Sequence, residues 1–225
     1  LHRVDRRQRQ MCIRDREDAR SQIQRQLYER TGKNIPVRIL ADLLDIRDEK
    51  WRNAIEGYLA WNKLALVVEP AYVKEAMEIY ESLDAKKFWR VSLVDTEKLM
   101  ALEHPVRENA LAEEIDCREA YVKAFLHFLL GNVIKCEDVQ QLRRCKIGVT
   151  ADCLLYQNFQ LRRLNPDNYT RRAFIGEKSM RRRQKELQAR LEELNKSQEE
   201  YSAAAAEARR LLGYEYLQDL SLIHI

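Results

Sequence analysis

The chain has 225 residues, which is room for one or two domains. Hydrophobic residues make up 45% and charged residues 34%, a composition typical of soluble proteins with long charged helices. Six glycines and four prolines are too few for a loop-rich or all-β fold. The longest mostly apolar run, residues 121–134, is interrupted by charged and polar side chains and is too short to span a bilayer, so the composition excludes a membrane-spanning protein.

The net charge of +4 resides at the N-terminus, because residues 1–16 hold six Arg and two Asp. Residues 11–16 and 220–225 resemble translated sequencing-adapter sequence. We therefore expect residues 1–16 and 220–225 to be foreign tails on a fragment of a longer protein, and we leave both out of the fold prediction. The alternative is a genuine basic N-terminal tail.

The cysteines do not predict a metal site. Apart from Cys12, they are Cys117, Cys136, Cys145 and Cys153, with no CxxC pair and no His at a ligand spacing from two of them. With no signal peptide, reduced thiols in a cytoplasmic protein are the expected state.

The first half of the chain alternates helices and strands. Asp48 is placed to cap a helix in which Trp51, Ala54, Ile55 and Tyr58 share one face. This alternation implies crossover connections and at least partly parallel strand pairing. The expected elements are helix 17–31, strand 37–43, helix 51–59, strand 64–68, helix 73–80 and strand 89–94.

The second half follows a connection over residues 95–116 that is broken at Pro105. Its first helix is expected to bury Ala124, Phe125, Phe128 and Leu129 and to end near Gly131. The expected elements are helix 120–131, strand 133–136, helix 138–144, strand 146–150, one long strand over 153–164, a turn at 165–168 and strand 173–175.

From residue 177 the pattern becomes a heptad repeat. Positions 180 to 212, spaced alternately four and three apart, are apolar at eight of ten places, which predicts a coiled coil of roughly 54 Å over 177–212. A single surface helix is the alternative. The expected partner is the helix of residues 17–31, running antiparallel.

No enzyme motif is present. Thr31-Gly32-Lys33 lacks the glycine five residues earlier that a phosphate-binding loop needs, since position 27 is Leu. The acidic residues Asp42, Asp45, Asp48 and Glu49 are more typical of solvated loops and a helix cap than of a metal site. No nucleophile and base stand in a recognisable pattern, so no catalytic, cofactor-binding or metal residues are predicted.

One charge feature indicates a function. Residues 162–185 contain nine basic residues against Asp167 and Glu177, with Tyr169 and Phe174 among them. Basic clusters with aromatic neighbours suit contact with a phosphate backbone, although a solvated coil face fits equally well. The candidate DNA-binding residues are Arg162, Arg163, Arg171, Arg172, Lys178, Arg181, Arg182, Arg183 and Lys185.

The sequences 35–44, 51–59 and 169–176 resemble the hinge of structural-maintenance-of-chromosomes (SMC) ATPases, in particular the SMC-like ATPases of bacterial Wadjet-type and MksB-like condensin systems. The resemblance implies an α+β fold, a two-subdomain SMC-type hinge flanked by antiparallel coiled-coil helices. The implied domains are an arm at 17–33, hinge subdomains at 34–100 and 101–176, and a second arm at 177–219. Ordinary SMC hinges carry several glycines late in the second half, where this chain keeps only Gly148 and Gly176.

The resemblance also implies a role. Such hinges join two ATPase subunits into a homodimer that acts on double-stranded DNA, in loop extrusion, chromosome organisation or plasmid restriction. ATP and Mg are expected at head domains outside this fragment, as are kleisin-type and accessory partners, so the fragment itself is not expected to be an enzyme. A nucleoid-associated place in the cytoplasm follows. The alternatives are a small α/β nucleotide-binding or enzymatic domain with helical appendages, and a coiled-coil scaffold without DNA contact.

Overall fold

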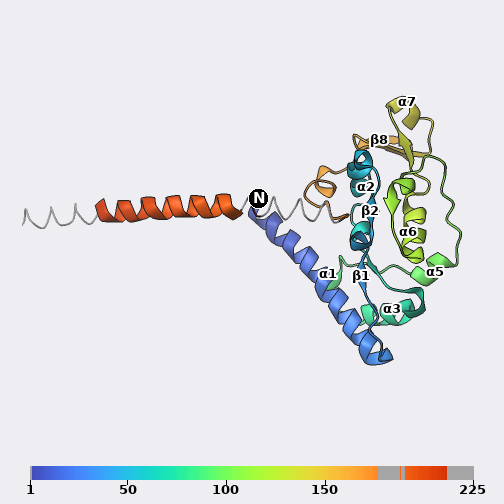
Figure 1. The fold of residues 1–225 in the computed structure, drawn as a ribbon, viewed down its shortest axis with the longest axis horizontal. Coiled ribbons are helices and arrows are strands. Elements are labelled where there is room, and N and C mark those ends of the chain that lie inside the picture. Colours follow the sequence, from blue (N-terminus) through green and yellow to red (C-terminus); the bar gives the residue numbers. More distant parts are fainter. Residues whose placement is uncertain (1, 177–187, 189–190, 212–225) are drawn as a thin grey trace, which may run out of the picture. The chain divides into compact units, whose positions relative to one another are not determined.

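The computed structural model describes residues 2–176, 188 and 191–211, with side chains from residue 15 onward. The chain divides into two compact units, residues 1–179 and 180–225, and each is described by itself. Figure 1 shows the first unit as a mixture of helices and short strands. The α+β class predicted from the sequence is confirmed.

The first element is a single long helix, α1 (His2–Thr31). It begins well before residue 17, so the part of the chain set aside as a tail is continuous with the predicted arm. Ala19, Ile23 and Leu27 are fully buried against the domain, where α1 contacts α3 (Val73–Glu81) and α4 (Ala85–Phe88). The apolar seam of this arm is thus used for packing on the domain.

Arg16, the last residue of the presumed tail, is also buried in the domain. Its guanidinium donates a hydrogen bond of 2.9 Å to the carbonyl of Arg90. The helix ends as predicted, because Gly32 adopts φ +68° and donates its N–H to the carbonyl of Tyr28. Residue 17 is therefore not a structural boundary.

The strands of the first half are shorter than predicted. β1 (Arg38–Ile39) pairs antiparallel with β3 (Leu66–Val67), and β2 (Asp45–Ile46) pairs antiparallel with β4 (Ile115–Asp116). After Ile39 the chain turns into a 3-10 helix, Leu40–Leu43, whose first N–H binds the carbonyl of Ala65. The predicted strand 37–43 is wrong beyond its first residues, because the 3-10 turn buries the neighbouring residues Leu40 and Ala41 and leaves Asp42 exposed.

The helices of the first half agree better with the prediction. Asp48 accepts the N–H of Lys50 and caps a 3-10 turn, Glu49–Trp51, that leads into α2 (Arg52–Leu59). Further 3-10 turns are Asn62–Leu64 and Pro70–Tyr72.

The predicted strand 89–94 is wrong: its only pairing among the described residues is a parallel bridge between Leu93 and Leu66, because α4 occupies the preceding residues and Trp89 lies exposed.

The second half opens with α5 (Thr96–Met100) and a 3-10 turn, Leu111–Glu114. It then forms α6 (Ala120–Leu130) and a four-stranded sheet in the order β5-β6-β7-β8, with the short α7 (Val139–Leu142) between β5 and β6. The strands are β5 (Ile134–Cys136), β6 (Ile147–Thr150), β7 (Leu154–Gln157) and β8 (Gln160–Arg163). The pair β5–β6 is parallel and the other two pairs are antiparallel. Parallel pairing was expected in the first half, where β1 and β3 instead pair antiparallel and only the isolated bridge between Leu66 and Leu93 is parallel among the described residues.

Three expectations for this half are corrected. The single strand 153–164 is a hairpin, since Asn158 and Phe159 both take positive φ and form a two-residue turn. The helix α6 buries Val122, Leu126 and Leu130, one position away from the predicted face, and Phe128 is exposed. Residues 173–175 form no strand: the chain there is tied down by side chains instead, as described below.

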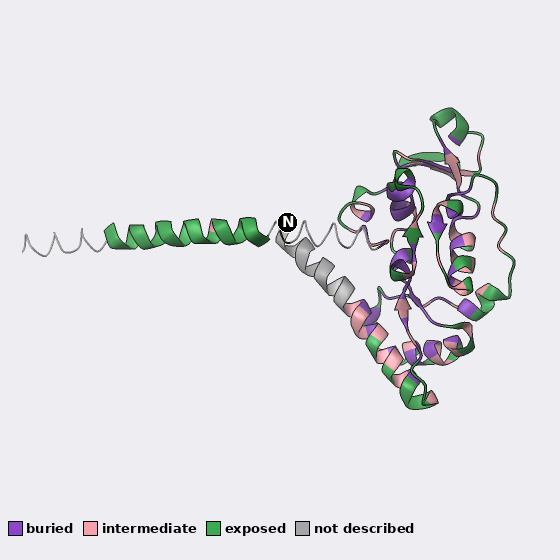
Figure 2. Ribbon diagram, in the orientation of Figure 1, coloured by how far each residue is buried: buried purple, intermediate pink, exposed green. Residues whose placement is uncertain are grey.

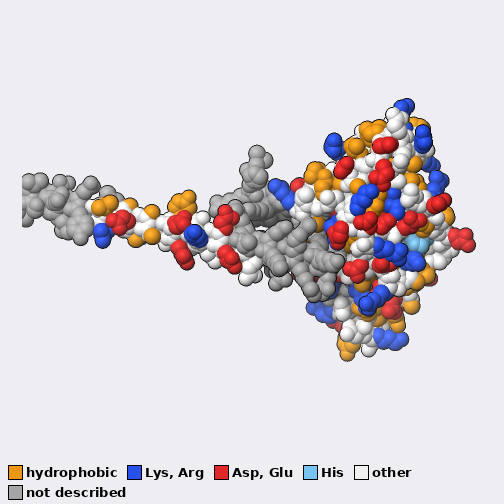
Figure 3. Space-filling view, turned by 45° about the horizontal axis from the view of Figure 1, so that its top comes forward, with side chains coloured by type: hydrophobic (Ala, Val, Ile, Leu, Met, Phe, Trp, Pro, Cys, Tyr) orange, Lys and Arg blue, Asp and Glu red, His pale blue; other side chains and the backbone are white. Residues whose placement is uncertain are grey.

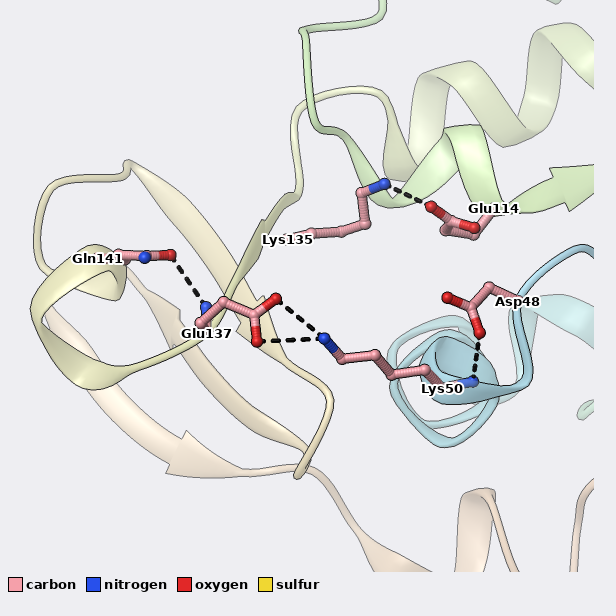
Figure 4. Close-up of polar contacts among 6 residues, drawn as sticks. All are labelled: Asp48, Lys50, Glu114, Lys135, Glu137 and Gln141. Carbon is pink, nitrogen blue, oxygen red and sulfur yellow. Dashed lines mark hydrogen bonds and ion pairs between the residues drawn. The ribbon is translucent and has the colours of Figure 1, made fainter.

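A single hydrophobic core runs through the first unit, from α1 to Ile175. In Figure 2 its buried residues line α2 and the inner side of α6. Ion pairs also join the two halves: Lys50 holds Glu137 at 3.0 Å, and Arg47 pairs with Asp116. Figure 4 shows the first of these beside the pair of Lys135 with Glu114.

In the second unit, residues 191–211 form a helix. Its heptad positions Leu191, Leu194 and Tyr201 are exposed. No helix among the described residues is long and apolar enough to cross a membrane.

Candidate nucleic-acid interface at the arm root

The arm root is defined here as residues 162–176, which precede the second predicted arm in the sequence. Four of the nine candidate DNA-binding residues lie in it. Arg162 and Arg163 are exposed on the edge strand β8, and Arg171 is exposed with an ion pair to Asp167 at 3.6 Å. The candidates Lys178, Arg181, Arg182, Arg183 and Lys185 lie outside the described residues.

Arg172 has a different position from the other three. Its guanidinium stacks over the Trp61 ring at 4.5 Å from the centroid and donates a hydrogen bond of 3.4 Å to Asn168. The guanidinium of Arg16 also lies over Trp61, at 5.2 Å. Arginine stacked on an aromatic ring is held in place with its charge retained. Trp61 therefore joins the start of the domain to the arm root.

A buried ion pair anchors the arm root to α2. Lys63 Nζ lies 2.5 Å from Glu56 Oε2, and the two side chains are 1% and 0% exposed. The same ammonium donates to the carbonyl of Asn168 at 2.6 Å and to that of Glu56 at 3.1 Å. The other carboxylate oxygen, Glu56 Oε1, accepts the N–H of Ile175 at 2.8 Å. The charged side chains of Lys63 and Glu56 thus bind two backbone groups of the arm root, the carbonyl of Asn168 and the N–H of Ile175.

A third charged side chain, that of Arg52, also binds the arm root. Arg52 donates to the carbonyl of Ile175 at 2.9 Å and makes a bidentate contact with Glu49, at 2.5 and 2.7 Å. The contact with Glu49 and its carboxylate charge raise the pKa of Arg52. The carbonyl of Asn168 and both backbone groups of Ile175 are therefore each bound by a charged side chain of α2 or of the turn that follows it. These charge-assisted hydrogen bonds fix the path of the chain through the arm root.

Desolvation opposes this anchor. Burial lowers the pKa of Lys63, and the Glu56 carboxylate offsets part of that effect. A buried pair of this kind is a weak source of net stability, yet removing either partner leaves an uncompensated charge. The anchor therefore favours one arrangement of the arm root over others more than it adds stability.

Close packing completes the contact. A Cβ at Gly57 would lie 3.0 Å from Leu164 Cδ1 and 3.1 Å from Tyr169 Cδ1, so a larger residue would require these side chains to shift by a few tenths of an ångström. Beside it a groove of about 580 Å³ is lined by Tyr58, Phe128 and Leu155 and carries Arg162 and Arg163.

On the face shown in Figure 3, acidic and basic side chains are interspersed over the domain. The arm root departs from this balance, because its only acid is Asp167. The geometry suits attraction of a polyanion by exposed arginines on a rigid base. Among the described residues, no three His, Cys, Asp or Glu side chains are grouped to hold a metal ion.

The anchor residues Arg52, Glu56 and Lys63 were not predicted from the sequence. On the helical pattern of α2, Arg52 and Glu56 fall where solvent-facing charges are expected, and Lys63 follows the helix in a turn. The spacing offers no signal for the ion pair either, since Glu56 and Lys63 are seven residues apart, which is too far for a pair within one helix.

Residues 36–144 match the family model of the SMC proteins flexible hinge domain. Among solved structures, a Pyrococcus furiosus Smc hinge domain with an extended coiled coil aligns at 20% identity and TM-score 0.48, covering 97% of this chain and 83% of that one. A second P. furiosus SMC hinge domain aligns at 18% identity and TM-score 0.46, covering 67% of this chain and 87% of that one. The structure of an asymmetric dimer of the Geobacillus stearothermophilus SMC hinge domain aligns at 17% identity and TM-score 0.46, covering 86% of this chain and 89% of that one.

The comparison with curated proteins gave no match. The family match covers β1 to β5, α2 and α6, and it ends just before Cys145. It begins five residues after the end of α1, so the hinge segment directly follows the long helix. Over residues 36–144 this chain is therefore similar to the flexible hinge domain of SMC proteins.

Proposed function

We propose that this chain is the dimerisation module of an SMC-like ATPase that acts on DNA. The observation that carries the proposal is the hinge match over residues 36–144 in a chain that has a long helix before it and a heptad helix after it. The module is non-catalytic, and its role is to join two subunits and to hold the bases of their arms.

The open edge of the four-stranded sheet supports dimerisation. All four residues of β8 are exposed, and β8 pairs on one side only among the described strands. Leu161 on this strand is 49% exposed, and Phe159 at the hairpin tip is 95% exposed. An open edge strand with apolar side chains is a surface that a second chain can cover.

A matched pair of variants tests this surface. Leu161→Glu places a charge on the open edge, and Val139→Glu places the same charge on α7, where the valine is similarly exposed. In a subunit-exchange assay with two fluorescent labels, Leu161→Glu should weaken association and Val139→Glu should leave it unchanged. Equal effects of the two variants would remove β8 from the interface.

DNA contact at the arm root is the second part of the proposal. Arg162 and Arg163 are exposed on one strand, and the sequence adds Lys178, Arg181, Arg182, Arg183 and Lys185 beyond it. Reversing Arg162 and Arg163 to Glu should weaken binding of duplex DNA at low salt and lower the salt slope by about 2. The control is Arg143→Glu with Arg144→Glu, an equally basic exposed pair beside α7.

Anisotropy titrations at several salt concentrations give both quantities. Binding that responds equally to both double variants would reduce the arm root to general surface charge. We further propose that the whole protein belongs to a Wadjet-type or MksB-like system, with ATP and Mg at its heads and kleisin-type and accessory partners outside this chain. A P-loop and an ABC-type signature in the flanking sequence are the check on that part.

A further inference from the structure

Two cysteines of the second half face each other, and neither contributes to the arm root. Cys136 is the last residue of β5, and Cys145 lies between α7 and β6. Their sulfur atoms are 3.8 Å apart. Cys136 is buried and Cys145 is partly exposed, so Cys145 is the residue of the pair that is nearer to solvent.

The surrounding structure holds the two thiols in place. Asp138 accepts the N–H of Gln141 at 2.8 Å and caps α7, and the Gln141 amide oxygen accepts the N–H of Glu137 at 3.0 Å (Figure 4). The parallel pairing of β5 with β6 fixes the strand that carries Cys136 beside the strand that begins two residues after Cys145.

The glycine at position 148 leaves room for both sulfur-bearing side chains. A Cβ there would lie 3.0 Å from Leu142 Cδ2 and 3.1 Å from Cys136 Sγ, so a larger residue on β6 would require Leu142 and Cys136 to shift. The lack of a side chain at position 148 therefore helps to keep Cys136 in its place beside Cys145.

We propose that Cys136 and Cys145 are a redox modification site, at which a peroxide converts the two thiols to a reversible disulfide. The Cys145 thiol gives up its proton and its sulfur attacks one peroxide oxygen. The O–O bond breaks, Cys145 becomes a sulfenic acid, and the leaving hydroxide takes up the released proton as the first water. The Cys136 sulfur then attacks the Cys145 sulfur, the S–O bond breaks, and the second water takes the Cys136 proton. Two thiols are oxidised and one peroxide is reduced to two waters.

The order of attack follows from the two environments. Burial, and then the neighbouring Cys145 thiol, raise the pKa of Cys136 to about 12, so Cys136 is protonated at neutral pH. Cys145 is the more exposed residue of the two and therefore reacts with the peroxide first. Cys136 then attacks the sulfenic acid on Cys145 to form the disulfide.

The bridge would close the segment around α7. Glu137, next to Cys136, carries the ion pair to Lys50 of the first half, and the exposed Arg143 and Arg144 lie inside the closed loop. Oxidation should therefore restrain α7 and slow trypsin cleavage after these two arginines several-fold.

The experiment treats the full chain with hydrogen peroxide and maps peptides without reduction. We expect a link between Cys136 and Cys145, slower cleavage after Arg143 and Arg144, and reversal of both by dithiothreitol. Cys145→Ser should abolish the link and the protection, whereas Cys117→Ser should leave both intact. Oxidation of Cys145 to sulfinic acid without a link, or links shared equally with Cys117, would overturn the proposal; Cys145→Ser tests it even if Cys136 variants fail to fold.

Discussion

Replacing Lys63 with Met should destabilise the domain far more than the loss of an ordinary surface ion pair. The substitution keeps most of the side chain's apolar volume and removes only its charge and its donors. It strands the Glu56 carboxylate, which is 0% exposed, and removes the donor to the carbonyl of Asn168. We expect a loss of about 3–5 kcal/mol in the free energy of unfolding.

The magnitude follows from what the carboxylate must do. A buried carboxylate without a cation takes up a proton instead, and holding that proton at pH 7 costs an ordinary glutamate about 4 kcal/mol. At pH 5 the same step costs about 1 kcal/mol. The destabilisation of Lys63→Met should therefore shrink by about 2–3 kcal/mol between pH 7 and pH 5.

Urea unfolding followed by tryptophan fluorescence measures both values. The control is Lys50→Met, which removes the exposed pair with Glu137 and should cost below about 1 kcal/mol. A Lys63→Met loss that equals the control, or one that does not change between pH 7 and pH 5, would refute the ionic anchor. The double variant Glu56→Leu with Lys63→Met should recover much of the stability, because no charge is then stranded.

The remaining predictions concern packing and alkaline pH. Gly57→Ala should cost about 1–3 kcal/mol, measured by urea unfolding, because its new methyl meets Leu164 and Tyr169; a neutral result would mean that the arm root moves freely away from α2. The raised pKa of Cys136, about 12, means that the folded state keeps a proton which the unfolded thiol releases near pH 8.5. Stability should therefore fall as pH rises above about 8.5, and Cys136→Val should reduce that fall relative to the wild type; parallel pH profiles would contradict it.

Hydrophobic periodicity predicted the helices of the first half well. The spacing of Trp51, Ala54, Ile55 and Tyr58 indicated the face of this helix that packs on the core; the first three are buried and Tyr58 is partly buried. The Asp48 cap was also read from the sequence, because a short acceptor before an apolar stripe has a local cause. The face of α6 was misjudged, since that helix is apolar nearly all round and its orientation depends on neighbours distant in sequence.

Strands were harder to predict, since their ends are set by tertiary contacts. The hairpin β7–β8 turns at Asn158 and Phe159, and only the asparagine is a conventional turn residue. The arm root shows the same limit. Its arginines stand out in the sequence as a basic cluster. The roles of Glu56 and Lys63 could not be predicted, because they depend on contacts with residues 168 and 175, which are more than 100 positions away in the sequence.

Sedimentation equilibrium of the full chain tests the proposed dimer most directly. Across protein concentrations from below one to tens of micromolar, the apparent mass should rise from that of one chain to that of two and then stay constant. Such a plateau is the behaviour of a closed dimer rather than of open-ended association through β8. A single-chain mass at tens of micromolar, or a mass that continues to grow beyond two chains, would contradict a dimerisation module.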